Sequence, residues 1–245
     1  MIKDLNNIVV EYLIRVPNKL LDWISIGNLD WHNLSGNSSA IQLLEDNPNR
    51  IDWLSLSCNS SAMHLLEENM DNINWNLLSI NPSALKLLEA NPLKINWKWI
   101  FSNPNAMHLI EDNIDKINWC TLSINPHPKA ISLLEANSDK IDWYTLSMNT
   151  NPKAIQMLEA FRDKIEWGLL SGNRSAIHML EANTDKIDWY RLSMNPAALD
   201  LLKSNYDKID WRLLSRNTSI FEIDVQKYAI LKEPYLVILD SINSF

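Results

Sequence analysis

"KIDWYRLSMNPAALDLLKSN" (Lys186–Asn205) recurs along this chain with small changes, and the recurrence decides the fold. A tryptophan marks each of nine units, numbered here in chain order: Trp31, Trp53, Trp75, Trp97, Trp119, Trp143, Trp167, Trp189 and Trp211. Successive tryptophans lie 22 residues apart, except for two gaps of 24. The two longer units, "SINPHPKAISLLE" and "SMNTNPKAIQMLE", carry two extra residues beside the Asn-Pro. The chain therefore consists mainly of one sequence motif that is repeated nine times.

The first part of each unit predicts a short helix. Asp188 can accept a backbone N–H of the first turn as an N-cap, and Trp189 and Leu192 then share one face. The apolar residues repeat every three or four positions rather than every two, which disfavours strands.

A second short helix follows. Asn195 is a good N-cap, and Pro196 suits the first helical position because it has no N–H to satisfy there. An apolar stripe then follows: Ala198, Leu199, Leu201 and Leu202. Asn205 should end the helix, since Asn tolerates the left-handed conformation that closes many helices.

A helix pair this short cannot bury its apolar face alone, whereas stacked pairs can. The sequence therefore predicts an all-α fold, an α-solenoid of helix-turn-helix repeats in one elongated, curved domain. At about 8–10 Å between helix axes, nine units give a rod on the order of 80–90 Å long. We expect an N-terminal helical cap at 1–29, the repeat array at 30–217 and a C-terminal helical cap at 218–245.

The repeated columns are interpreted as structural. The tryptophans should form the core between units, the Asn before the second helix should cap it, and Glu and Lys should form a solvated stripe. In the sixth unit either Asn149 or Asn151 could occupy the capping column.

No column predicts catalysis. His64, His108 and His178 share one slot, but His64 and His108 are two units apart, on the order of 20 Å, too far to share a metal ion. The serines have no base placed for one of them alone, and motifs for phosphate or metal binding are absent from the sequence. We expect no enzyme activity, no cofactor and no metal, and we expect Cys58 and Cys120 to be reduced thiols.

The net charge of −8 is spread over the chain without a Lys/Arg cluster, which argues against a nucleic-acid partner. No apolar run reaches the roughly 20 residues that span a bilayer, and the start of the chain does not fit a signal peptide. We expect a protein that binds no membrane and is not secreted.

Positions that vary between units are the candidates for binding a partner. They are the two residues after each tryptophan and the one after each serine. Tyr, Trp and Arg dominate binding energy at interfaces. The candidate partner-binding residues are Trp99, Tyr144, Tyr190, Arg191, Arg212, Met148 and Met194.

The phrase "NPxAIxLLExNxDKIDWxxLSxN", over roughly residues 28–222, resembles the short Trp/Leu repeat proteins of giant nucleocytoplasmic large DNA viruses, mimivirus relatives especially. The resemblance implies a viral repeat protein in the host cytoplasm or virus factory, or in the virion. It supplies no catalytic residues. The function expected is a non-enzymatic scaffold that binds a protein partner of the host or the virus.

Two alternatives stay open. "LNNIVVEYLIRVPNKLLDWI" near the start has a faint similarity to an F-box, although it lacks the usual opening Leu-Pro. That similarity implies an adaptor that recruits a host ubiquitin ligase through residues 1–29. The other alternative is a virion or assembly component whose sides or ends self-associate.

Overall fold

The computed structural model describes residues 18–242, with side chains up to residue 233. The described chain is mostly helical, and each unit begins with a short helix at its tryptophan. These first helices are α2 (Trp31–Ser35), α4 (Trp53–Leu56), α6 (Trp75–Ile80), α8 (Trp97–Ile100), α10 (Trp119–Ile124), α12 (Trp143–Leu146), α14 (Trp167–Ser171), α16 (Trp189–Leu192) and α18 (Trp211–Leu214).

A second helix follows in the first eight units: α3 (Ile41–Glu45), α5 (Met63–Glu68), α7 (Leu85–Ala90), α9 (Met107–Glu111), α11 (Pro128–Ala136), α13 (Pro152–Ala160), α15 (Ile177–Glu181) and α17 (Leu199–Lys203). Single 3-10 turns connect the helices: Ile26–Asn28, Ser38–Ala40, Pro48–Arg50, Met70–Asn72, Pro82–Ala84, Pro92–Lys94, Pro104–Ala106, Ile114–Lys116, Ser138–Lys140, Arg162–Lys164, Arg174–Ala176, Thr184–Lys186, Tyr206–Lys208 and Thr218–Ile220. The predicted all-α class and the repeated helix-turn pattern are confirmed.

The predicted N-caps are present. The Asp188 side chain accepts from the Arg191 N–H, and the Asn195 side chain accepts from the Ala197 N–H. Both bonds satisfy backbone donors that a helix leaves free at its start.

The predicted left-handed closure of the second helix is wrong. No non-glycine residue among 18–242 has a positive φ, and Asn205 has φ −131°. Its side-chain amide instead donates to the Leu201 carbonyl, one of the carbonyls that a helix leaves free at its end. Asn at this position therefore acts through its side chain, not through its backbone.

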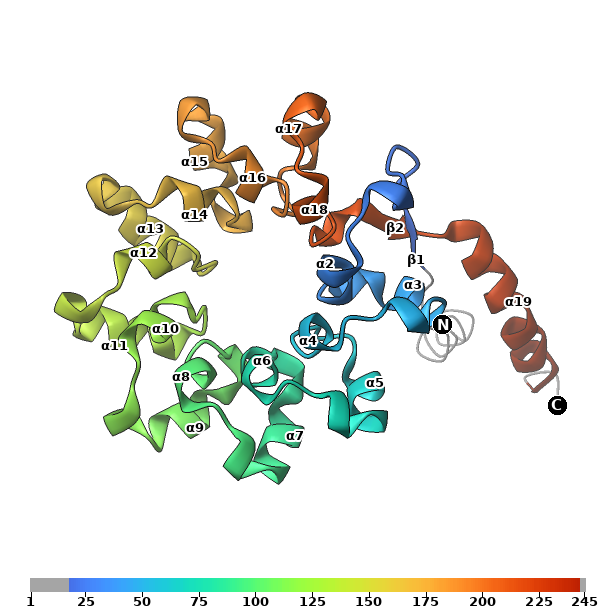
Figure 1. The fold of residues 1–245 in the computed structure, drawn as a ribbon, viewed down its shortest axis with the longest axis horizontal. Coiled ribbons are helices and arrows are strands. Elements are labelled where there is room, and N and C mark those ends of the chain that lie inside the picture. Colours follow the sequence, from blue (N-terminus) through green and yellow to red (C-terminus); the bar gives the residue numbers. More distant parts are fainter. Residues whose placement is uncertain (1–17, 243–245) are drawn as a thin grey trace.

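The nine units form a ring (Figure 1). The first helices lie on the inner side and the second helices on the outer side, and the core lies between the two layers. Leucines such as Leu34, Leu78 and Leu122 are fully buried there, with the unit tryptophans packed half-buried against them.

The prediction of an elongated rod is wrong because the first unit contacts the ninth as any unit contacts its predecessor. The Asn37 side-chain amide donates to the Ser215 and Asn217 carbonyls at 2.9 and 3.1 Å. Asn59 donates in the same way to the Ser35 and Asn37 carbonyls. Nine units close when each turns by about 40° (360°/9), so the curvature expected of a solenoid here completes a circle.

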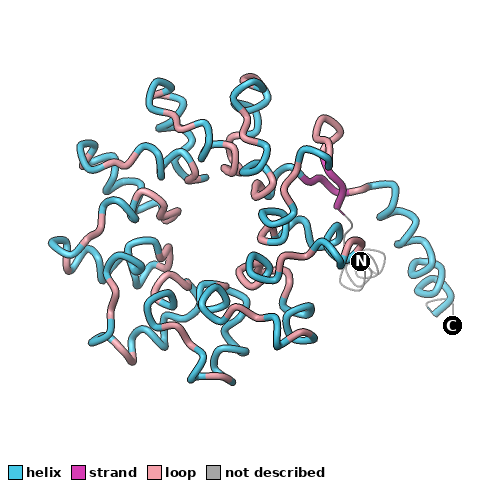
Figure 2. Tube along the Cα trace, viewed as in Figure 1, coloured by secondary structure: helices cyan, strands magenta, loops and turns pink. Residues whose placement is uncertain are grey.

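The ends of the chain also differ from the predicted helical caps. Strand β1 (Asn18–Leu20) pairs antiparallel with β2 (Phe221–Ile223), with Lys19 opposite Glu222 (Figure 2). Strand β2 lies where the ninth unit would begin its second helix. The turn Ile26–Asn28 followed by buried Leu29 corresponds to Pro48–Arg50 followed by Ile51 at the end of the first unit. The ninth unit is therefore assembled from both ends of the chain.

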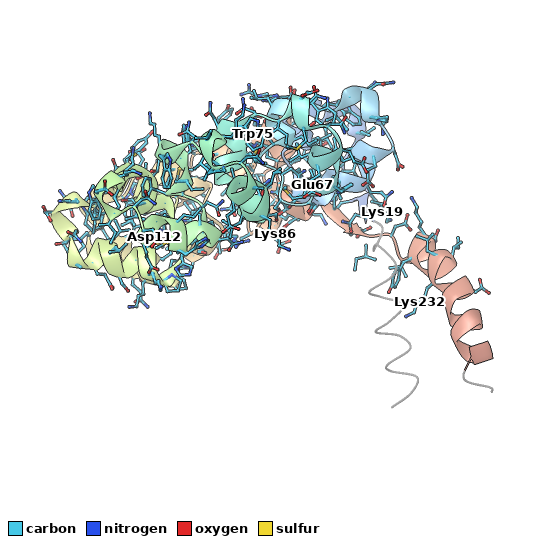
Figure 3. All side chains as sticks on the ribbon, turned by 90° about the horizontal axis from the view of Figure 1, so that it is seen from below. Lys19, Glu67, Trp75, Lys86, Asp112 and Lys232 are labelled. Carbon is cyan, nitrogen blue, oxygen red and sulfur yellow. The ribbon has the colours of Figure 1, made fainter. Side chains whose placement is uncertain are left out.

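After β2 the chain forms α19 (Val225–Ile242), which leaves the flat ring on one side (Figure 3). The described part of the expected C-terminal cap is thus a strand and a projecting helix rather than a cover for the last unit. Most of the F-box-like stretch lies outside the described residues. Its described part, from Asn18 onward, is a strand and the start of the closing unit, not a continuous helix.

Candidate functional site on the inner surface

Helix geometry determines which residues of each first helix face the centre of the ring. At 3.6 residues per turn, the tryptophan and the third and fourth residues after it share one side. In unit 8 these are Trp189, Leu192 and Ser193, which pack toward the core. The first, second and fifth residues after each tryptophan, called the inner positions below, therefore lie on the opposite side, toward the centre of the ring.

All seven residues predicted to bind a partner occupy inner positions. Trp99, Tyr144, Tyr190, Arg212 and Met148 are exposed, and Arg191 and Met194 are half-buried. The exposed fractions of Tyr144 and Tyr190 are 59% and 44%, high for tyrosines on a packed helix. The variable residues are thus gathered on the inner side of the ring by the fold itself.

The inner positions carry an unusual charge distribution. Across nine units they comprise 27 residues, of which four are Lys or Arg and none is Asp or Glu: Lys98, Arg191, Arg212 and Arg216 are the basic ones. The chain as a whole has 30 acidic and 22 basic residues. Three of the four bases lie in the adjacent units 8 and 9, so one sector of the inner surface is basic within an acidic protein.

Tyr190 and Arg212 contact each other across the boundary between units 8 and 9. The Arg212 guanidinium donates to the Tyr190 hydroxyl and lies over its ring, 5.5 Å from the centroid. A guanidinium held against an aromatic face keeps its charge and its remaining donors available. The pair is therefore a pre-oriented cation on the inner surface.

A small pocket lies in units 6 to 8, where inner helices α12, α14 and α16 turn toward the outer helices. It has a volume of about 130 Å³. Its lining residues are Met148, Thr150, Leu169, Gly172, Asn173, Arg174, Arg191, Met194 and Pro196. Gly172 makes room for it, since a Cβ there would lie 3.0 Å from the Met194 Cε atom.

Two arginines line the polar side of the pocket. Arg191 lies 3.9 Å (Nε to Oδ2) from Asp188, a loose ion pair. Arg174 is exposed and pairs with no carboxylate of the described residues. The pocket thus combines an apolar floor of Met148, Leu169 and Met194 with guanidinium groups.

The structure brings six of the seven predicted residues into units 6, 8 and 9 but leaves Trp99 apart on α8. In that unit Phe101 replaces the serine of the other eight and is fully buried. The predictions missed Gly172 and Arg174. Gly172 could have been found from the sequence, because the units before and after it have methionine, Met148 and Met194, at the same position. Arg174 follows the capping Asn and belongs to no predicted column.

The capping Asn column is not a ligand site. The nine Asn side chains are at most 2% exposed, and each amide donates to two carbonyls of the preceding unit. Asn149 is the member from unit 6, and Asn151 instead caps α13.

The Lys and Glu columns, which were predicted to form a solvated stripe, contact specific side chains. Lys208 lies over the Trp189 ring at 4.3 Å, and five further units show a Lys or Arg over their own tryptophan. On the outer helices the glutamates pair with the next unit, as Glu45 does with His64 at 2.7 Å. His64, His108 and His178 are thus each paired with a separate glutamate.

Among residues 18–233, whose side chains the structure describes, no group of three or more His, Cys, Asp or Glu lies close enough to hold a metal ion. Burial raises the pKa of the Cys58 thiol and outweighs the opposing effect of nearby Arg216, so the thiol is a poor nucleophile at neutral pH. No described helix is long and apolar enough to cross a membrane.

The fold and its inner surface define a closed ring of helix-pair repeats. In comparisons with known proteins, no family model, no curated protein and no solved structure matches the chain.

Proposed function

We propose that the ring is a closed α-solenoid that acts as a non-enzymatic scaffold and binds a protein partner through its inner positions. One observation carries the proposal: the first helices lie on the inner side of the ring, and their varied inner positions include the exposed side chains of Tyr144, Tyr190 and Met148. Aromatic and arginine side chains are the usual anchors of protein interfaces. On the outer helices, five glutamates instead pair with a His or Lys of the next unit.

The proposed setting follows from the resemblance of the repeat to those of giant DNA viruses. We place the protein in the host cytoplasm or the virus factory, with a host or viral partner. Because the candidate residues lie on the first helices, the proposal is for a partner that contacts those helices rather than the outer ones.

Photo-crosslinking tests the proposal. A benzophenone amino acid in place of Tyr190 should crosslink to a discrete partner in a lysate of the producing cells. The same group in place of Leu93, which is 98% exposed on an outer turn, is the control. Tyr190→Ala with Arg212→Ala should retain the far-ultraviolet circular dichroism and lose the partner in a pull-down. A partner that crosslinks through position 93 and tolerates the double variant would contradict the proposal.

A further inference from the structure

The basic sector and its pocket indicate what chemistry a partner must have, if the inner surface is the binding surface proposed above. The pocket volume of about 130 Å³ is slightly below that of an engineered cavity of ~150 Å³ that holds a benzene molecule. It is lined by Met148, Leu169 and Met194 and therefore suits one aliphatic or aromatic side chain. Methionines adapt their shape to such a side chain.

The groups around the pocket select for charge. Arg174 and Arg191 line it, and Arg212 is held against Tyr190 in the next unit. No inner position is itself acidic, although the whole chain has a net charge of −8. The capping carboxylate of Asp188 lies 3.9 Å from Arg191 and partly balances it, which leaves Arg174 and Arg212 as the arginines with no carboxylate against them among the described residues. Complementary charge of this kind steers partners and rejects those of the wrong sign.

We infer that units 6 to 9 bind an extended acidic segment of a partner protein, with one apolar side chain seated in the pocket between Met148 and Met194. The acids of that segment pair with Arg174, Arg191 and Arg212. A nucleic-acid strand fits less well, because an apolar pocket gives a phosphate chain nothing to bury and the protein as a whole repels it.

The repeat supplies variants that change the site with little risk to the fold. Gly172→Met places in unit 7 the residue that units 6 and 8 have at the same position, and Gly172 has no positive φ that would exclude a side chain. It fills the pocket and leaves the charges unchanged. Arg174→Ser copies Ser38, and Arg191→Thr copies Thr145. Arg162→Ser on an outer turn, which copies Ser138, is the matched charge control.

The test uses fluorescence anisotropy of the full chain with labelled decapeptides. The probe contains Asp and Glu around one central Leu. One control replaces the Leu with Ser, a second replaces the acids with Lys, and a third is an oligothymidylate strand. The wild type should bind the probe best, and added salt should weaken that binding. Replacing the peptide Leu with Ser, or filling the pocket with Gly172→Met, should lower the affinity about tenfold. In both cases the apolar side chain of the peptide is no longer buried in the pocket.

The double variant Arg174→Ser with Arg191→Thr should weaken binding and flatten its salt dependence, while Arg162→Ser should change neither. The inference is overturned if the Lys peptide binds as well as the probe, if Gly172→Met binds unchanged, or if oligothymidylate binds more tightly. In each of those cases, a partner that still crosslinks through position 190 would support the proposed function. Failure of the acidic-segment inference can therefore be distinguished from failure of the proposed function.

Discussion

A single side chain, the capping Asn, makes three hydrogen bonds in every unit. In unit 5 the Asn125 amide donates to the Phe101 carbonyl at 2.9 Å and to the Asn103 carbonyl at 3.2 Å, and its oxygen accepts from the His127 N–H. The Asn125 amide and the two carbonyls are buried, so each of these two bonds satisfies a buried polar atom. Asn125 thus serves as a cap within its own unit and as the link to the unit before it.

Asn125→Ala should therefore cost far more than an ordinary cap. It removes the cap, leaves the buried Phe101 carbonyl without a donor, and takes one of two donors from the Asn103 carbonyl, which still accepts from the Ala106 N–H. The expected loss is about 2–4 kcal/mol in the free energy of unfolding. Urea denaturation followed by circular dichroism measures it. Asn137→Ala is the control, because half-buried Asn137 makes a single side-chain bond, to the Leu133 carbonyl, so the loss should be about 1 kcal/mol. Equal losses would show that the bonds between units contribute nothing.

Asp52 gives the ring a defined acid sensitivity. Burial raises the pKa of its carboxyl, but the Ser55 N–H bond and His32 at 3.1 Å together lower it below its usual value. A carboxyl with a lowered folded pKa stabilises the fold above its unfolded pKa of about 3.9, and that stabilisation is lost as the pH falls through the folded value.

Asp52→Asn should keep the cap, as Asn74 does in the next unit, and lose this sensitivity. The difference in free energy of unfolding between wild type and variant should be largest near pH 5 and shrink as the pH falls further. Urea denaturation across pH 2.5–7 measures this difference. In a His32→Ala background the difference should be smaller throughout. A difference that grows as the pH falls would have the wrong sign for this explanation.

At the scale of helices, the two extra residues of units 5 and 6 lengthen the second helix without disturbing the column of capping Asn. Helices α11 and α13 span nine residues, whereas α7 spans six. The insertion falls after the capping Asn, so Asn125 and Asn149 keep their bonds to the preceding unit.

Deleting Pro126 and His127 should therefore be tolerated. It joins Asn125 to Pro128 and recreates the Asn-Pro junction of unit 3. The expected change in stability is within about 1 kcal/mol, because the edited segment is a connection and the core residues Ile131 and Leu134 stay in register. Deleting Leu87 and Leu88 instead removes a fully buried side chain and should unfold at least that unit. Thermal unfolding compares the two deletions, and similar losses would contradict the prediction.

The sequence predicts the helices well because capping and apolar spacing are local properties. Asp188, Asn195 and the stripe from Ala198 to Leu202 all have the expected roles. Asn205 ends the helix as predicted, but through its side chain rather than its backbone. Asparagine can do either, because it tolerates a left-handed backbone and its amide can also donate to the carbonyl four residues before. Spacing alone cannot choose between them.

At the scale of the molecule, ring closure could not be predicted because the rotation from one unit to the next depends on packing between units. One signal was present in the sequence. The ninth unit has no second helix, and residues 25–29 resemble the end of a unit although they precede the first unit. The inner site depends on the same rotation, which decides that the variable residues converge. Their identity was predictable, whereas the meeting of Met148, Arg191 and Met194 at one pocket was not.

Removing residues 1–24 should open the ring. It deletes β1, the Leu21 N–H bond to the Ile220 carbonyl and buried Ile24, all of which lie at the closing unit. The radius of gyration from small-angle X-ray scattering should rise while the helix content is retained. Removing only residues 1–17 leaves β1 in place, and that form should scatter as a ring. An unchanged radius after the longer deletion would show that the bonds between units 1 and 9 suffice.

Closure of the Asn column also bears on how the protein fluctuates. In an open repeat array the terminal units have one neighbour each, so they open first and unfolding proceeds inward. Here the amide of Asn37 completes the circuit with unit 9, and nine units share nine interfaces. No unit is terminal, so releasing any one of them breaks two interfaces at once. Native-state hydrogen exchange should therefore be protected evenly around the circle, with no gradient from either end.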